Sequence, residues 1–558
     1  MGRLASLLAA GLFATASARP WSRDEGHNTT ATNTTAPTMV NDFADIEPSE
    51  ELTWVPCFDN PKVSCANLLV PLDYADESAG MTNIAWVKYI SVDESAEDII
   101  FNPGGPGQSG LSHVALGAEQ LLASFGSQYN LISFEPRGVN NSGPALTCFP
   151  GKVEAREAFK QSGSNTVPLQ EMYQRSKAHG QYCTRANANT TAKYGGTVAV
   201  AQDIMHFVDL RAAEKGTPDS AKLWYYGVSY GTALGQTLAA LFPERIGRMV
   251  LDGNVYGVQH YTGVLPSDVD DSDAAFHDFF QSCFNAGPEK CTFHGSSTSV
   301  EEIENRYLTL LQNLRELPAI HNTDDAPGVI TDALVSNQFF SQLYNLVGNA
   351  ASLAETLAML EQGLADAAWE TYFGPAATGP APYGSAAAAF DDQEALHLIT
   401  CIDANKNFPI TTYEEYLDVR EVFRKESYYA GANSAATNLL LCLGMDITPP
   451  PSQQFPGFDP AGTTTSFPIL FVNFLRDPIT PLSSAQKMSA FFPGSVVLAQ
   501  NSTGHGMSAA ESECTSGWTR AYMAEGTLPP PGTVCQPDVR PFVDTPTKRG
   551  VVLPGVYF

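Results

Sequence analysis

A serine between two glycines is the first residue that could do chemistry. Ser229 lies in GVSYG, which follows the apolar run LWYY and precedes the helix-favouring segment TALGQTLAALF. A strand, a sharp turn and a helix in this order would strain the central residue and expose its hydroxyl above a sheet. We therefore predict that Ser229 is a nucleophile with an unusual backbone conformation. A Gly-Ser loop without a function is the alternative, and the strand-turn-helix context disfavours it.

A serine hydroxyl needs a neighbouring base, and that base needs a carboxylate to fix its tautomer. Of the ten histidines, only His505 in NSTGHGMS follows the last predicted core strand, FPILFVNF. Asp477 comes just after the same strand, and Asp252, at the end of RMVLD, is the rival acid. We favour Asp477 because its segment also delivers His505, and we expect Asp252 to be structural. The His505 imidazole should then lie about 2.6 to 3.2 Å from the Ser229 hydroxyl.

Acyl transfer also requires two backbone N–H groups that point at the developing oxyanion. Tyr230, directly after the nucleophile, would supply one. The glycine-rich loop FNPGGPGQSG would supply the other from Gly105, because glycines permit close backbone approach to a substrate. A phosphate cradle is the competing interpretation, but the loop lacks the Lys and Ser/Thr of a P-loop. This chemistry needs no metal and no organic cofactor, and no metal-ligand spacing occurs in the sequence.

Apolar runs that alternate with helical stretches must position these residues. Short runs punctuated by Gly and Pro favour a largely parallel sheet with crossover helices. They are NIAWVKYISV, DIIF, NLISF, LWYY, RMVL and FPILFVNF. After residue 254 the periodicity becomes helical, as in VEEIENRYLTLLQNL and TYEEYLDVREVF, which predicts a helical cap inserted into the catalytic fold.

The chain has 558 residues, which exceeds one ordinary core and leaves room for a sizeable second unit. We expect five parts in order along the chain. They are a signal peptide over 1–18, a flexible glycosylated leader over 19–50, the first part of the core over 51–254, the mainly helical cap over 255–460, and the C-terminal part of the core with the acid and histidine loops over 461–558.

The N-terminus predicts export. Arg3 precedes an apolar run from Leu4 to Phe13, and Ala16 and Ala18 have the spacing of a cleavage site, so we expect a secreted, extracellular product. The alternative, a membrane anchor, would need a longer run, and no membrane insertion is expected. Ten cysteines in an exported chain predict disulfides, with sequential neighbours as the simplest pairing. Glycosylation sequons occur at Asn28, Asn33, Asn140, Asn189 and Asn501.

The net charge is −29, which argues against nucleic acid because phosphate binding needs clustered Lys and Arg. Solubility is the simplest reason for the acidity. Acidic walls that attract cationic peptide N-termini are the alternative. The sequence gives no information on the oligomeric state.

These residues together resemble the tripeptidyl-aminopeptidase-like branch of the prolyl aminopeptidase family of serine peptidases, in the α/β-hydrolase superfamily. NPGGPGQSG resembles the oxyanion loop of this branch, GVSYGTALG its nucleophile elbow, LRDPITP its acid segment and TGHG its histidine loop. CANLLVPLDY and GTLPPPGTVC extend the resemblance toward both ends, so that it spans residues 54–535. Two positions depart from the family: EPRG begins with Glu135 in place of Asp, and Asn140 stands where a glycine is usual.

The resemblance implies an α/β-hydrolase fold, with a mostly parallel central sheet, flanking helices and an inserted helical cap domain. It also implies an exopeptidase that releases short N-terminal peptides or single residues by Ser-His-Asp acyl transfer. Relatives bind the free substrate amine with acidic cap residues. Asp403, beside Cys401 in TCIDANK, is our candidate, and a solvent-facing loop acid is the alternative interpretation.

Two other functions compete with this one. A carboxylesterase would use the same residues, since a triad and an oxyanion hole serve either acyl group. A hydrolase fold that only binds a partner is the second rival, and the presence of all three triad residue types argues against it.

Overall fold

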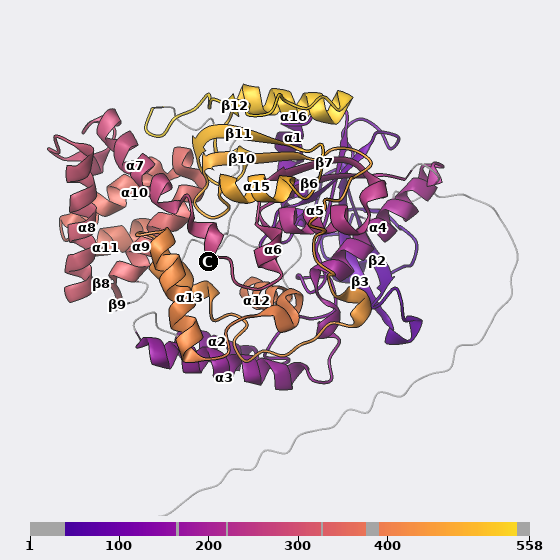
Figure 1. The fold of residues 1–558 in the computed structure, drawn as a ribbon, viewed down its shortest axis with the longest axis horizontal. Helices are drawn as coiled ribbons and strands as arrows, with labels where there is room; N and C mark the ends of the chain where they lie inside the picture. The colour runs from indigo at the N-terminus through magenta and orange to yellow at the C-terminus, as the bar shows by residue number, and fades with distance from the viewer. Residues whose placement is uncertain (1–38, 163–166, 219–220, 325–326, 375–389, 544–558) are drawn as a thin grey trace, which may run out of the picture. The chain divides into compact units, whose positions relative to one another are not determined.

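The computed structural model describes residues 39–162, 167–218, 221–324, 327–374 and 390–543 (Figure 1). The predicted signal peptide and the sequons at Asn28 and Asn33 lie outside these residues. Residues 39–50, which we expected to belong to a flexible leader, instead pair with the core. The backbone N–H of Val40 donates to the Pro56 carbonyl at 3.0 Å, and that of Ser49 donates to the Asn67 carbonyl at 3.0 Å.

The core is built on one ten-stranded sheet with the order β1-β2-β3-β5-β4-β6-β7-β10-β11-β12. The first three pairings in this order are antiparallel, and all later pairings are parallel. The strands are β1 Val55–Pro56, β2 Val63–Pro71, β3 Met81–Tyr89, β4 Asp98–Asn102, β5 Asn130–Phe134, β6 Leu223–Val228, β7 Ile246–Asp252, β10 Leu470–Arg476, β11 Val496–Thr503 and β12 Val534–Cys535. The six apolar runs identified in the sequence all form strands of this sheet, which confirms the predicted fold class.

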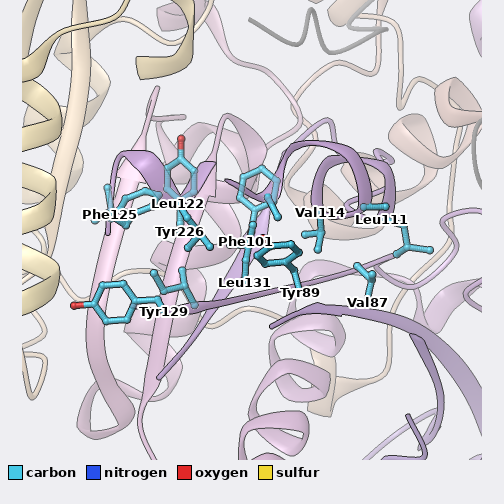
Figure 2. Close-up of a cluster of buried hydrophobic side chains, with 14 of the residues drawn as sticks. Val87, Tyr89, Phe101, Leu111, Val114, Leu122, Phe125, Tyr129, Leu131 and Tyr226 are labelled. Atoms are coloured by element: carbon cyan, nitrogen blue, oxygen red, sulfur yellow. The ribbon is translucent and has the colours of Figure 1, made fainter. Parts of the chain in front are cut away.

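Helices cover both faces of the sheet, because its central strands are apolar on both sides. On one face, α1 (Leu111–Ala123) and α16 (Glu513–Glu525) pack on a core that includes Phe101 and Tyr226. Figure 2 shows part of this cluster between the sheet and α1. On the other face lie α4 (Thr197–Glu214), α5 (Tyr230–Leu241) and α15 (Leu482–Ser489).

The segment between β7 and β10 is mainly helical and has its own apolar core. Its helices are α6 Gly257–His260, α7 Ser272–Ala286, α8 Val300–Glu316, α9 Asp332–Gln342, α10 Leu346–Glu361, α11 Ala365–Ala368, α12 Asp392–Ala404, α13 Tyr413–Glu426 and α14 Gly431–Asn438. Two features of the cap were not predicted. One is a hairpin of β8 (Ala319–Asn322) and β9 (Pro327–Ile330). The other is that a segment before β6 also contributes helices to the cap.

Helices α2 (Val153–Ser162) and α3 (Leu169–Asn187) interrupt the first half of the core and pack against the cap (Figure 1). The Thr147 hydroxyl and the Cys148 backbone N–H both donate to Glu394 of α12, at 2.7 and 2.9 Å. A Cβ at Gly180 of α3 would lie 2.2 Å from the Leu443 carbonyl oxygen, so the two segments are in close contact. The cap is therefore assembled from two separate parts of the chain.

All ten cysteines form disulfides between sequential neighbours, as predicted. The pairs are Cys57–Cys65, Cys148–Cys183, Cys283–Cys291, Cys401–Cys442 and Cys514–Cys535. In the described ranges, no helix is long and apolar enough to cross a membrane. The same residues contain no group of three His, Cys, Asp or Glu side chains that could hold a metal ion.

Candidate active site

Ser229 stands on the turn between β6 and α5, with φ of 57° and ψ of −126°. This strained conformation confirms the prediction that the backbone of Ser229 is unusual. Two glycines make the turn possible through close packing. A Cβ at Gly227 would lie 2.3 Å from the Gly231 carbonyl oxygen, and one at Gly104 would lie 2.8 Å from the Ser229 Cβ. The hydroxyl is thus presented at the carboxyl end of the sheet, directly beside the glycine-rich loop.

Asp477 and His505 come together in the structure although 28 residues separate them. They follow β10 and β11, which are parallel neighbours, so the loops after both strands meet at the same edge of the sheet. His505 Nδ1 lies 2.9 Å from Asp477 Oδ2 and 3.1 Å from Oδ1. The Thr480 hydroxyl donates to Asp477 at 2.9 Å, and the Thr480 and Ile479 backbone N–H groups donate to the same carboxylate. These bonds fix the carboxylate against the imidazole.

The expected hydrogen bond between His505 and Ser229 is not formed. His505 Nε2 is buried and has no hydrogen-bond partner among the described residues. The loop that carries it nevertheless lies against the nucleophile turn, since a Cβ at Gly506 would be 3.3 Å from Val228 Cγ1. Catalytic hydrogen bonds are often long without substrate and tighten when it binds. The open Nε2 is the atom that would take a proton from a nucleophile.

Carboxylates surround the imidazole and set its protonation. Burial alone would lower the pKa of His505, but the charge and hydrogen bond of Asp477, together with the charge of Asp252, raise it above its usual value. A raised pKa makes the imidazole a stronger base, which suits a group that must accept a proton from serine.

Asp252, the rival acid in the sequence, has a different place. It is fully buried at the end of β7, where one carboxylate oxygen accepts from Tyr226 at 3.0 Å and from the Met507 backbone N–H at 2.8 Å. It makes no hydrogen bond to His505. Burial raises the pKa of Asp252 to about 6, against the opposing effect of these two donors.

Two backbone N–H groups are available for an oxyanion. Gly105 and Tyr230 line the same pocket as Ser229. Neither N–H donates to another described residue. The Tyr230 hydroxyl is anchored at the far end of its side chain by Thr197, at 2.5 Å. The predicted oxyanion groups therefore line one pocket with the serine, and both N–H groups are free to donate to a ligand oxygen.

Asp403 is in a different position from the one that an amine anchor requires. Its side chain is 3% exposed, and it accepts from the Thr197 backbone N–H at 2.8 Å and from the Thr197 hydroxyl. His260 Nε2 lies 2.9 Å from Asp403 Oδ2. These partners occupy both carboxylate oxygens, and His260 and Tyr230, but not Asp403, line the pocket that contains Ser229. The placement makes Asp403 a support for these two side chains and disfavours direct contact with a substrate amine.

Asp268 is the acidic residue that does line the Ser229 pocket. It lies in a short 3-10 helix, Pro266–Val269, just after α6. Its Oδ1 is buried without a hydrogen-bond partner, and its carboxylate forms no ion pair with a described residue. Burial, with the charges of Asp270 and Asp477, raises the pKa of Asp268 well above its usual value, against the effect of Lys487. Sequence reasoning missed this residue, since LPSDVDDSD contains several acids and only packing distinguishes one of them.

The chain is similar to known serine hydrolases over most of its length. A family model described as TAP-like protein matches residues 427–535, which contain Asp477 and His505. Serine protease Hip1 of Mycobacterium tuberculosis is 26% identical over 508 residues, which cover 87% of this chain and 91% of that protein. Tripeptidyl aminopeptidase of Streptomyces lividans is 26% identical and covers 88% of this chain and 87% of that protein. Carboxylesterase B of Mycobacterium tuberculosis is 25% identical, with coverage of 85% and 86%.

Proposed function

Because this chain is a serine hydrolase of the α/β-hydrolase superfamily, homologous to TAP-like serine peptidases, we propose that it is a secreted exopeptidase that removes short peptides or single residues from free N-termini. One observation carries the choice of substrate. Asp268 places an unpaired buried carboxylate in the same pocket as Ser229. A buried carboxylate without a partner is costly, and a substrate ammonium group would relieve that cost.

The proposed reaction is acyl transfer to water. Ser229 attacks the peptide carbonyl while His505 Nε2 accepts its proton, and Asp477 holds the imidazole and stabilises its charged form. The Gly105 and Tyr230 N–H groups stabilise the oxyanion. His505 then donates the proton to the departing amine, and water enters by the reverse sequence to release the N-terminal fragment. No step requires a metal or cofactor.

Asp268 replaces Asp403 as the proposed amine anchor. The ammonium group of a substrate would lower the pKa of Asp268 and hold its carboxylate in the ionised form, so that binding and ionisation are coupled. The α-ammonium group of a bound peptide would then lie at a fixed distance from Ser229. That distance would set how many residues are removed in each cut.

Export is supported by the N-terminal sequence and by the five disulfides, which persist in oxidising compartments. Of the described sequons, Asn189 is exposed and best placed to carry a glycan. The Asn140 side-chain N–H donates to buried Glu135 at 2.8 Å, so a glycan there would break this contact.

A carboxylesterase is the second candidate, because a relative with that name matches 85% of the chain. The discriminating experiment exposes the purified enzyme and a Ser229→Ala variant to a peptide library, its N-acetylated copy and a set of aryl esters, with products read by mass spectrometry. We expect shortened peptides from the free-amine library only. Cleavage of esters without any peptide cleavage would overturn the peptidase proposal, and a fully active Ser229→Ala variant would overturn the mechanism.

A further inference from the structure

A second, more polar pocket adjoins the pocket that contains Ser229. Residues of the segment 427–433 and of helices α8, α9 and α13, which are labelled in Figure 1, line this pocket. Three residues, Ser336, Tyr429 and Asn433, line both pockets. The Asn433 side-chain N–H donates to the Ser336 hydroxyl at 3.2 Å, so polar side chains form the boundary between the two spaces. A substrate at Ser229 thus has a second chamber beside it.

Positive charge is concentrated in this second pocket. Arg315, Arg420 and Arg424 line it, with Asp332 as the one acidic lining residue, although the whole chain carries a net charge of −29. We call it the arginine pocket. Arg315 pairs with Asp332 at 2.8 Å, and Arg424 approaches Glu421 at 3.5 Å with both side chains about half exposed. Such exposed pairs are weak and leave most of the positive potential in place.

Arg420 is the residue from which we infer a ligand. Its Nε is buried without a hydrogen-bond partner, and it forms no ion pair with any described residue. A guanidinium group presents its N–H donors in a planar fork that matches a carboxylate. The residue as a whole is only partly buried, so the cost falls on this one N–H group, and an anion bound to the guanidinium group would supply the acceptor that the fold does not.

We propose that the arginine pocket binds a carboxylate of the substrate. The enzyme would then favour peptides that carry a negative charge next to the cleaved bond or on its C-terminal side. This inference rests on the proposed exopeptidase function. The carboxylate has two possible sources, an acidic side chain or the C-terminus of a short peptide. Asp268 and Arg420 would then hold opposite charges of one bound peptide in two adjoining pockets.

The test measures kcat/KM for pairs of peptides with free N-termini. One pair differs by Glu or Gln at a single position, and the other by a C-terminal carboxylate or amide. We expect the wild type to favour the charged member of at least one pair, and Arg420→Gln to reduce that preference about tenfold, the loss of one charge-assisted contact. The pair that responds identifies the source of the carboxylate. Arg420→Lys should retain part of the preference.

Arg520→Gln is the matched control, because Arg520 is a partly exposed arginine on α16 and its loss changes the net charge equally. It should keep the wild-type preference. Arg424→Gln is the second pocket variant, in case Arg420→Gln alters the fold. The inference is overturned if the wild type shows no preference, or if both pocket variants leave the ratio within each pair unchanged.

Binding of the same peptides to the Ser229→Ala protein separates this inference from the proposed function. If the active enzyme cleaves no peptide, the exopeptidase proposal fails, and the arginine pocket is judged by binding alone. Tighter binding of the charged peptides, lost in a Ser229→Ala/Arg420→Gln protein, would still support the pocket. Equal binding of charged and neutral peptides would reject it.

Discussion

The carboxylate of Asp252 accepts a hydrogen bond from the Met507 backbone N–H at 2.8 Å, two residues after His505. The backbone carbonyl of the same aspartate accepts from the Ser229 N–H at 3.1 Å. Asp252, at the end of β7, is therefore hydrogen-bonded both to the turn that carries Ser229 and to the loop that carries His505. This makes Asp252 a positioning residue, although Asp477 contacts the imidazole.

Substitution of the two aspartates should separate these roles. Asp477→Asn should lower kcat about 10³- to 10⁴-fold, because the imidazole loses the carboxylate that selects its tautomer. Asp252→Asn keeps an acceptor for Met507 and Tyr226, so its loss in kcat/KM should stay below about tenfold. Steady-state kinetics on one peptide substrate measures both. A larger loss from Asp252→Asn than from Asp477→Asn would reverse the assignment.

The pH profile should report the charges around His505. Catalysis needs the neutral imidazole, and the pKa of His505 is raised, so kcat/KM should fall as the pH drops through a midpoint above the usual histidine value of about 6.5. Asp252→Asn removes a negative charge that raises this pKa, so the acidic limb should move to lower pH. Because Asp252 itself has a pKa of about 6, the wild-type limb describes the coupled groups. An acidic limb that stays unmoved in Asp252→Asn would show that this charge does not act on His505.

Asp268→Asn should weaken substrate recognition. We expect KM for peptides with a free N-terminus to rise about tenfold or more with a smaller change in kcat, because the lost contact is made in the ground state and the transition state alike. N-acetylated peptides and aryl esters should respond much less. Equal effects on free and acetylated peptides would remove Asp268 as the amine anchor.

The same substitution should stabilise the fold near neutral pH. The folded-state pKa of Asp268 is raised, so its protonated form stabilises the fold at low pH, and this contribution is lost as the pH rises through the folded-state pKa. Asparagine is neutral throughout. The Tm of Asp268→Asn should therefore exceed the wild-type Tm near pH 7.5, and the difference should shrink toward pH 4. Thermal denaturation across this range gives the answer, and an opposite trend would mean that the carboxylate has a partner in the folded state.

Loss of the Cys401–Cys442 disulfide should cost more stability than loss of Cys57–Cys65. The first closes a separation of 41 residues and the second a separation of 8. Chain entropy then gives roughly 4 against roughly 2.5 kcal/mol. Paired Cys→Ser variants, compared by denaturant unfolding, test the order. Equal losses would mean that native packing around each bridge outweighs the loop length.

The candidate site was largely predictable because its signals are local. GVSYG between a strand and a helix predicts Ser229 as the nucleophile, and the order of the last strand and two loops predicts Asp477 and His505 as its partners. The residue type at position 140 also agrees with its local backbone conformation. Its φ of 45° is one that asparagine tolerates, which agrees with the expectation from the sequence resemblance that a glycine is usual there.

The features that the sequence did not predict depend on contacts between segments that are distant in the chain. Asp268 differs from its acidic neighbours only in that packing leaves it unpaired, and no sequence pattern carries that information. Asp403 was our candidate for the amine anchor, with a solvent-facing loop acid as the alternative, but it lies in α12 and is buried against Thr197 and His260, which are 206 and 143 residues away. The contribution of α2 and α3 to the cap was missed for the same reason. Their partners are in α12 and the segment after α14.

The central claim is that Ser229 is the nucleophile and that His505 activates it. A fluorophosphonate probe, with the labelled residue mapped by tandem mass spectrometry, tests this most directly. The account predicts a single adduct on Ser229, none in Ser229→Ala, and labelling slowed by about 10³-fold or more in His505→Ala. An adduct on another residue, or an undiminished rate in a folded His505→Ala protein, would contradict it.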